Sequence, residues 1–82
     1  MNFGQAIEAL KEGKLVAREG WNGGGLFVMK QTVQESAKKV LVSRGTTLKY
    51  ENQMLIIKPN GTADSWVPSS SDVFAEDWIV VE

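Results

Sequence analysis

The chain has 82 residues, no cysteine and no histidine, and its nine Lys and Arg against ten Asp and Glu give a formal net charge of -1. This composition excludes disulfides, zinc fingers, a catalytic thiol and a histidine base, and the weak charge argues against nucleic acid polymers or anionic membranes bound through bulk electrostatics. No apolar run approaches the roughly 20 residues that span a bilayer, and the N-terminus lacks a signal-peptide pattern. We expect a single domain over residues 1–82 in the cytoplasm, stabilised as a homo-oligomer because it is small.

The segment before Gly13 predicts a helix with a marked start and a marked end. Asn2 can cap the first turn, while Gln5, three residues later, can reach back to it in a capping box. The apolar residues fall at spacings of three and four and form one stripe, made of Phe3, Ala6, Ile7 and Leu10. Gly13 suits the left-handed conformation that often ends a helix.

Two short strands are predicted next, Leu15–Arg18 and Leu26–Lys30, and the glycine-rich segment between them makes a hairpin loop. The region 31–51 is predicted as irregular or mixed. Its apolar spacing from Val33 to Leu41 favours a helix, whereas the run Val40–Val42 fits a strand equally well.

The C-terminal part predicts a hairpin, a short helix and a final strand. Met54–Lys58 and Thr62–Val67 form the hairpin around the turn Pro59–Gly61. Ser69-x-x-Asp72 is similar to a capping box and opens one or two helical turns. The last strand, Trp78–Val81, must be paired or covered. The predicted fold class is α+β, with the N-terminal helix packed on a small antiparallel sheet and the short helix before the last strand.

Few side chains are suited to catalysis. A serine nucleophile without histidine would need a lysine base, and we expect no Ser-x-x-Lys pair to supply one. Asp72, Glu76 and Asp77 could in principle hold a divalent cation, but such a group is more typical of a solvated acidic face. We expect no catalytic residue, no metal site and no cofactor.

The stretch R-E-G-W-N-G-G-G, Arg18–Gly25, matches neither the G-x-x-x-x-G-K-[ST] phosphate loop nor G-x-G-x-x-G. One interpretation is a flexible hairpin tip. The other is a binding loop, in which glycines let backbone N–H groups approach a ligand and Trp21 provides a flat wall for a base or sugar. On a loop, Trp21 is expected to need something that closes over it: another protomer, a ligand or both.

Other polar and aromatic residues also have two interpretations. Arg18 can form an ion pair with Glu19 or with a carboxylate elsewhere, or grip a phosphate. The run Ser69–Ser71 can cap the short helix or present hydroxyl and N–H groups to an anion. Trp66 and Trp78, at strand ends, are assigned mainly to the core.

Four blocks of the sequence point to a known family. They are N-F-G-x-A-I-E-A-L-K-x-G-K at 2–14, A-R-E-G-W-N-G at 17–23, W-V-P-S-x-x-D at 66–72 and A-E-D-W at 75–78. In their order and approximate spacing they resemble the small phage and prophage proteins known as Thoeris anti-defence proteins of the second type.

The resemblance implies a binding protein, not an enzyme. Thoeris systems answer infection with a cyclised ADP-ribose signal, made by a TIR-domain protein, that switches on a suicidal effector. Members of this family bind the signal without cleaving it, and some also bind cyclic oligonucleotide signals at a separate site. They form homotetramers with ligand pockets between protomers. By resemblance, the protein acts in the cytoplasm of an infected or lysogenic bacterial host.

The resemblance also implies a set of ligand-binding residues. Trp21 and Phe27 would line or stack against the adenine or ribose. The loop backbone and Asn22 would bind ribose hydroxyls or phosphate, and the second loop would add polar contacts. The full set is Arg18, Trp21, Asn22, Gly23, Gly24, Phe27, Ser69, Ser70 and Asp72. Two positions depart from the family pattern: Gly24 replaces a frequent lysine, and Ser70 a frequent glutamine.

Overall fold

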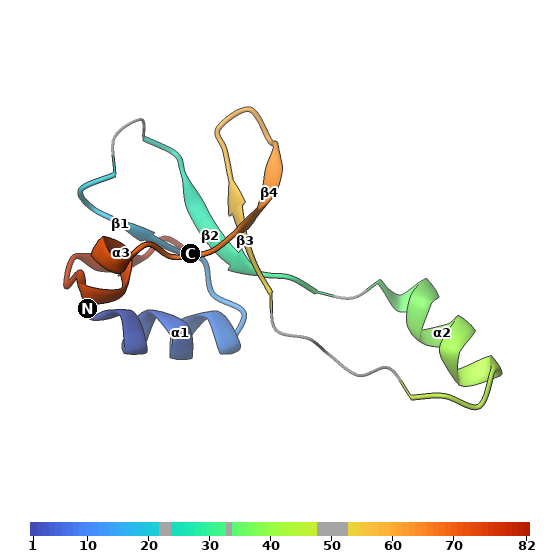
Figure 1. The fold of residues 1–82 in the computed structure, drawn as a ribbon. Coiled ribbons are helices and arrows are strands. Elements are labelled where there is room, and N and C mark those ends of the chain that lie inside the picture. The colour runs from blue at the N-terminus through green and yellow to red at the C-terminus, as the bar shows by residue number, and fades with distance from the viewer. Residues whose placement is uncertain (22–23, 33, 48–52) are drawn as a thin grey trace.

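A computed structural model describes residues 1–21, 24–32, 34–47 and 53–82. Its elements form one antiparallel sheet with helices, which is the α+β fold expected from the sequence (Figure 1). In chain order they are α1 (Phe3–Lys11), β1 (Val16–Arg18), β2 (Phe27–Lys30), α2 (Glu35–Ser43), β3 (Met54–Ile57), β4 (Ala63–Trp66), α3 (Ser70–Phe74) and β5 (Trp78–Val80). No helix among the described residues is long and apolar enough to cross a membrane.

The start and end of α1 are those that the sequence predicts. The Asn2 side chain accepts a hydrogen bond from the Gln5 backbone N–H at 2.8 Å, and the Gln5 side chain accepts one from the Asn2 N–H at 2.9 Å. Gly13 follows with φ at 85°, the left-handed conformation of a helix end. The stripe of α1 that faces the sheet buries Ala6, Ala9 and Leu10.

The sheet has the strand order β4-β3-β2-β1-β5, and every pair is antiparallel. Both predicted hairpins, β1–β2 and β3–β4, are confirmed, although each strand is one or two residues shorter than expected. The last strand, β5, pairs with β1, and Ala17 lies opposite Ile79. The C-terminal strand therefore lies beside the first strand of the chain. The Met1 ammonium group also donates to the Trp78 carbonyl oxygen at 2.8 Å.

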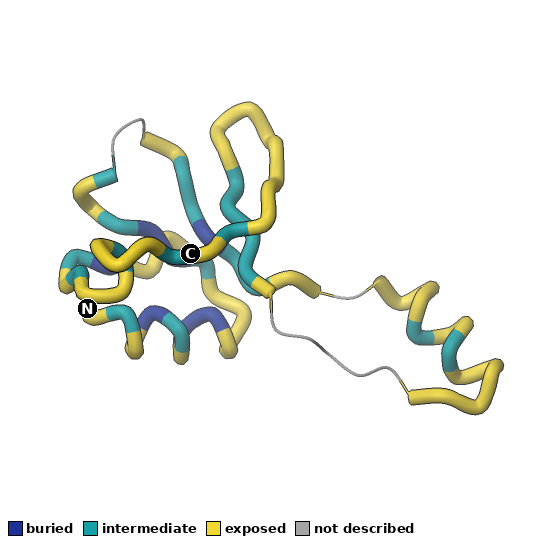
Figure 2. The backbone as a smooth tube through the Cα atoms, viewed as in Figure 1, coloured by how far each residue is buried: buried dark blue, intermediate teal, exposed yellow. Residues whose placement is uncertain are grey.

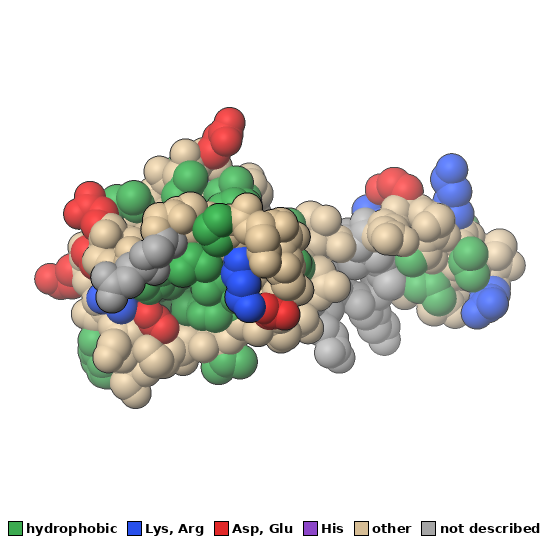
Figure 3. All heavy atoms as spheres, turned by 90° about the horizontal axis from the view of Figure 1, so that it is seen from above, with side chains coloured by type: hydrophobic (Ala, Val, Ile, Leu, Met, Phe, Trp, Pro, Cys, Tyr) green, Lys and Arg blue, Asp and Glu red, His purple; other side chains and the backbone are tan. Residues whose placement is uncertain are grey.

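The two faces of the sheet are covered unequally. The face toward α1 holds the core, with Val16, Val28 and Trp78 fully buried. The strand register places six apolar side chains on the opposite face, and among the described residues no helix covers them. We call this the open sheet face, and it consists of Ala17, Phe27, Met29, Leu55, Ile57 and Ile79. Figure 3 looks down from the top of Figure 1 and shows hydrophobic side chains gathered in the middle of the body.

Region 31–51, predicted as irregular or mixed, contains the helix α2 at Glu35–Ser43. The helical spacing therefore prevails there over the strand-like run Val40–Val42. Residues 34–47, which we call the arm, extend away from the body (Figure 1) and are mostly exposed (Figure 2). The molecule therefore measures 46 × 27 × 22 Å with a radius of gyration of 14.8 Å. A compact domain of this length would have about 12 Å.

The α1 capping box should be measurable as stability. Asn2→Ala removes the side-chain oxygen that satisfies the Gln5 N–H, so we expect a loss of about 1 kcal/mol in the free energy of unfolding. The melting temperature should fall by about 4–8 °C for a domain of this size.

Gln34→Ala is the matched control, because Gln34 is the N-cap of α2 but makes no capping hydrogen bond. It should leave the melting temperature within about 2 °C of the wild type. Equal losses in the two variants would contradict a specific role for the Asn2 side chain.

Candidate functional site

A cavity of about 250 Å³ lies where the glycine loop meets the open sheet face. It brings together four residues of the predicted binding set, namely Arg18, Trp21, Gly24 and Phe27. The remaining lining residues are Ala17, Glu19, Gly25, Leu26, Ile79 and Val81. Asn22 and Gly23 belong to the same loop but lie outside the described residues. The cavity is the candidate site.

The backbone pairing sets the walls of this cavity. Ala17 on β1 lies opposite Ile79 on β5, and Phe27 on β2 points to the same side of the sheet. At the loop, Gly25 has φ at 96°, and a Cβ there would lie 3.2 Å from the Pro59 Cγ. The positive φ favours glycine at this position, and a Cβ would in addition be tight against the Pro59 ring.

Trp21 is half-buried and contacts two tryptophans of the same chain, so the cover expected from another protomer or a ligand stays a prediction for its remaining surface. Its ring packs edge-on against Trp66 and Trp78, with centroids 6.0 and 5.4 Å away. Trp66 and Trp78 also pack edge-on at 6.0 Å. This tryptophan cluster fixes the orientation of the Trp21 ring. The part of Trp21 that borders the cavity is held in place before any ligand arrives.

Arg18 pairs with carboxylates, which is one of the two alternatives that the sequence leaves open. Its Nε donates to Asp77 Oδ1 at 2.9 Å and its Nη1 donates to Asp72 Oδ1 at 3.0 Å. The three side chains keep only 22%, 32% and 13% of their surface exposed, in the order Arg18, Asp77, Asp72. Asp77 Oδ2 accepts a further hydrogen bond, from the Gly20 N–H at 3.0 Å. One positive charge thus meets two negative charges beside the cavity.

These contacts shift the acid–base equilibria of all three groups. The hydrogen bond from Arg18 lowers the pKa of Asp77, against a smaller effect of burial. Burial by itself raises the pKa of Asp72, but hydrogen bonds from Ser69 and then Arg18 outweigh it and leave that pKa lowered. The two carboxylates, Asp77 before Asp72, raise the pKa of Arg18. All three groups are therefore held in their charged forms.

The second predicted loop lies outside the cavity lining. Ser69 caps α3 in the predicted capping box: its Oγ accepts from the Asp72 N–H at 3.3 Å, and Asp72 Oδ2 accepts from the Ser69 N–H at 2.9 Å. Ser70 is the first residue of this helix and is exposed. Of the three, Asp72 alone is tied to the cavity, through its ion pair with Arg18.

The described residues offer little for catalysis. They contain no group of three acidic residues placed to hold a metal ion. Ser36 and Lys39 have the Ser-x-x-Lys spacing of a serine–lysine pair, so the expectation that the chain has no such pair is wrong. Both side chains are exposed on α2, and neither lines the candidate site.

Sequence reasoning missed two wall residues at the C-terminal end of the chain, Ile79 on β5 and Val81 just after it. Alternation separates neighbouring side chains of one strand onto two faces, but only the register between β1 and β2 puts Ala17 and Phe27 on the same face. The partner of β5 likewise cannot be read from local sequence, because β1 and β5 are about 60 residues apart in the chain.

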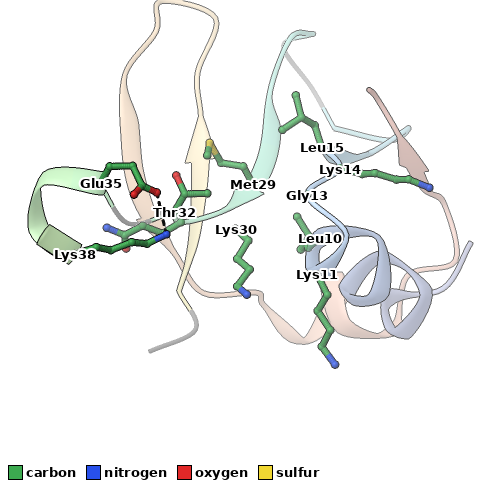
Figure 4. A pocket seen from close by; sticks show the side chains of 11 residues that line it. Leu10, Lys11, Gly13, Lys14, Leu15, Met29, Lys30, Thr32, Glu35 and Lys38 are labelled. Atoms are coloured by element: carbon green, nitrogen blue, oxygen red, sulfur yellow. Dashed lines mark hydrogen bonds and ion pairs between the residues drawn. The ribbon is translucent and has the colours of Figure 1, made fainter. Parts of the chain in front are cut away.

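A second hollow, of about 420 Å³, lies between the end of α1, β2 and the start of α2 (Figure 4). Four lysines line it: Lys11, Lys14, Lys30 and Lys38. Three of them form ion pairs with glutamates: Lys11 with Glu8 at 3.2 Å, Lys14 with Glu12 at 3.1 Å and Lys38 with Glu35 at 3.1 Å. In Figure 4 the ammonium groups of Lys11 and Lys14 point away from one another. The lysines therefore do not converge on one anion.

Comparison with known proteins identifies the family. A family model described as the Thoeris anti-defense 2-like domain matches residues 1–81. The chain belongs to this family. Thoeris anti-defense 2 of Bacillus phage SP01 is 36% identical over 84 residues, which cover 99% of this chain and 94% of the phage protein. The resemblance seen in the four sequence blocks is confirmed, and membership supports a phage role against Thoeris defence.

The Arg18 ion pairs should make the stability fall in acid. The pKa values of Asp72 and Asp77 are lowered in the folded state. The contribution of each to the free energy of unfolding is therefore fully present above the unfolded pKa of about 3.9, and it is lost as pH falls through the folded pKa. The urea midpoint, followed by tryptophan fluorescence, should therefore fall between about pH 5 and pH 2. Asp77→Asn should lower the midpoint at pH 7 and reduce this acid dependence.

Asp64→Asn is the control, since the ion pair of Asp64 with Lys58 is half exposed and such surface pairs contribute little. Its unfolding should follow the wild-type pH profile. An unchanged acid dependence in Asp77→Asn would show that Asp77 does not carry the effect.

Proposed function

We propose that the protein binds and sequesters a cyclic ADP-ribose-type immune signal without cleaving it, and so keeps the Thoeris effector inactive. The cavity under the glycine loop is the observation that carries the proposal. It combines aromatic walls with loop backbone at one edge of the sheet, and the chain belongs to a family of Thoeris anti-defence proteins. Cyclic oligonucleotides are a second ligand class to be tested.

The chemistry of the cavity suits a purine nucleotide more than a free phosphate. Trp21 and Phe27 border it and offer ring faces on which a base can stack. Glycines leave the loop N–H groups accessible to ribose or phosphate oxygens. Arg18 is already neutralised by two aspartates, so its role is to position the loop and to offer any further donor to a ligand. Ser69, Ser70 and Asp72 would contribute from the other side of Arg18.

An oligomer, with a tetramer as the expected form, belongs to the same proposal. A cavity of about 250 Å³ on one chain is small for a cyclic dinucleotide-sized ligand. The open sheet face continues directly from the cavity through Ala17, Phe27 and Ile79. A second copy seated on this face would deepen the cavity and bury its apolar surface. The assembly would act in the cytoplasm of the infected or lysogenic host, where the signal is made.

Sequestration and degradation are distinguished by recovering the ligand. Purified protein is mixed with cyclised ADP-ribose isomers and cyclic oligonucleotides, filtered, heated and analysed by mass spectrometry. We expect one ligand to disappear from the filtrate and to return chemically unchanged after heating, with a nanomolar dissociation constant, about -12 kcal/mol. An altered ligand would establish a degrading enzyme. No binding would favour a protein-interaction module.

Two phenylalanines provide a matched test of the site. Phe27 lines the cavity, whereas Phe74 on α3 is 83% exposed and lies outside the lining. Phe27→Ala should weaken ligand binding at least about tenfold, because a stacked or packed ring contributes about 1–3 kcal/mol per base. Phe74→Ala should bind like the wild type. Calorimetry measures both affinities, and equal effects would place the ligand elsewhere.

A further inference from the structure

Asp77 lies outside the cavity lining but reaches the chain at the start of the glycine loop through two of its groups. It comes directly before β5. Its backbone carbonyl oxygen accepts a hydrogen bond from the Glu19 N–H at 3.1 Å, and its Oδ2 accepts one from the Gly20 N–H at 3.0 Å. Asp77 therefore holds two consecutive N–H groups at the point where the chain leaves β1.

The two N–H groups belong to a turn that leads into the glycine loop. The Trp21 N–H donates to the Arg18 carbonyl oxygen at 3.2 Å and so closes a turn of four residues. Such a turn uses the N–H of its last residue only, so the N–H groups of Glu19 and Gly20 need acceptors elsewhere. Asp77 supplies both of them. Its remaining oxygen, Oδ1, accepts from Arg18 Nε at 2.9 Å and holds the first residue of the turn.

Gly20 shows how closely the carboxylate approaches this turn. A Cβ at Gly20 would lie 3.0 Å from Asp77 Oδ2, which is closer than an ordinary van der Waals contact. The φ of Gly20 is not positive, so its backbone conformation is open to other residues. Space for the carboxylate is therefore the physical reason for glycine at this position.

The same segment also supports the ring of Trp21. The backbone of Trp21 is held through the turn by Asp77, and its ring packs edge-on against Trp78, the next residue, with the centroids 5.4 Å apart. Trp78 is buried, and its backbone N–H donates to the Met1 carbonyl oxygen at 3.1 Å. Two consecutive residues, anchored in the body of the protein, thus hold the backbone and the ring of the aromatic wall.

We propose that Asp77 is the positioning residue of the candidate site: it fixes the turn 18–21 and thereby sets Trp21 against the cavity. Asp77 acts through Gly20 and Arg18, without touching a ligand. The effect on the turn rests on these contacts alone, whereas the effect on a bound signal rests on the function proposed above. A turn that is ordered beforehand loses less conformational entropy when a ligand binds.

Asp77→Asn tests the positioning role with almost no change in volume. The amide offers one acceptor oxygen, whereas Arg18 Nε and the Gly20 N–H both need an acceptor. The charged guanidinium forms the stronger hydrogen bond, so the amide oxygen should stay with Arg18 and the Gly20 N–H should lose its partner. Hydrogen exchange at Gly20 should become at least about tenfold faster, as expected for a lost hydrogen bond to a charged group.

Two spectroscopic signals separate positioning from a mere loss of stability. The Gly20 amide proton should move upfield in the NMR spectrum of Asp77→Asn, because it no longer donates to a carboxylate. The near-ultraviolet circular dichroism should lose amplitude, because coupling between the packed tryptophans depends on the orientation of the Trp21 ring. Both are measured at pH 7 on fully folded protein, where a lower stability alone would change neither signal.

Two further variants complete the test. Glu76→Gln makes the same change from carboxylate to amide at the adjacent, exposed residue, and it should leave both signals as in the wild type. Gly20→Ala keeps the charge of Asp77 but places a methyl group against its Oδ2, so it should reproduce the loss of circular dichroism in weaker form. Unchanged signals in Asp77→Asn, or equal changes in Glu76→Gln, would overturn the proposal.

Retention of cyclised ADP-ribose isomers, measured on the same variants, separates this inference from the proposed function. Asp77→Asn should weaken binding about five- to thirtyfold, the cost of ordering the backbone of one residue, and Glu76→Gln should bind like the wild type. If the wild type retains no isomer while Gly20 exchanges faster in Asp77→Asn, the proposed function fails and the positioning of the turn stands. If Asp77→Asn retains an isomer as tightly as the wild type, sequestration stands and the positioning role is wrong.

Discussion

The arrangement of the candidate site depends on one guanidinium group. Arg18 ends β1, and its hydrogen bonds reach Asp72 on α3 and Asp77 just before β5. Asp77 in turn holds the Gly20 N–H at the start of the glycine loop. Partners 54 and 59 residues away in the chain thus meet at one side chain. Because these groups are only partly exposed, losing one of them would leave the others without their charged partner.

The same network pairs Arg18 with two aspartates, so a ligand at the candidate site would meet shape and aromatic surface more than free charge. Behind it, Trp78 is buried and donates its Nε1–H to the Asp72 carbonyl oxygen at 2.9 Å. The ring of Trp78 then supports Trp21, whose orientation at the cavity is fixed by the body of the protein. A cavity that is already formed loses less conformational entropy when a ligand binds, and this would favour the tight binding that the proposed function requires.

Apolar surface left uncovered by a single chain is the second constraint. A domain of 82 residues has a small core, and in this one no described helix covers the open sheet face, where Ile79 keeps 38% of its surface exposed. Exposed apolar patches of this kind generally mark interfaces. Assembly would therefore serve stability and binding together, since the open sheet face borders the cavity.

The sequence by itself determined the local elements and the family. The Asn2 capping box, the α1 stripe, the two hairpins and the Ser69 capping box depend on residues close in the chain, and all of them are confirmed. For region 31–51 the sequence allows either a helix or a strand, because its apolar residues have both helical and strand spacing; the structure has the helix α2 there. Only the tertiary structure decided that β5 pairs with β1, that Arg18 pairs with two aspartates, and that Trp21 packs on Trp66 and Trp78. These contacts join segments about 45 to 60 residues apart in the chain. Local sequence patterns do not show which of the distant segments will pack against each other.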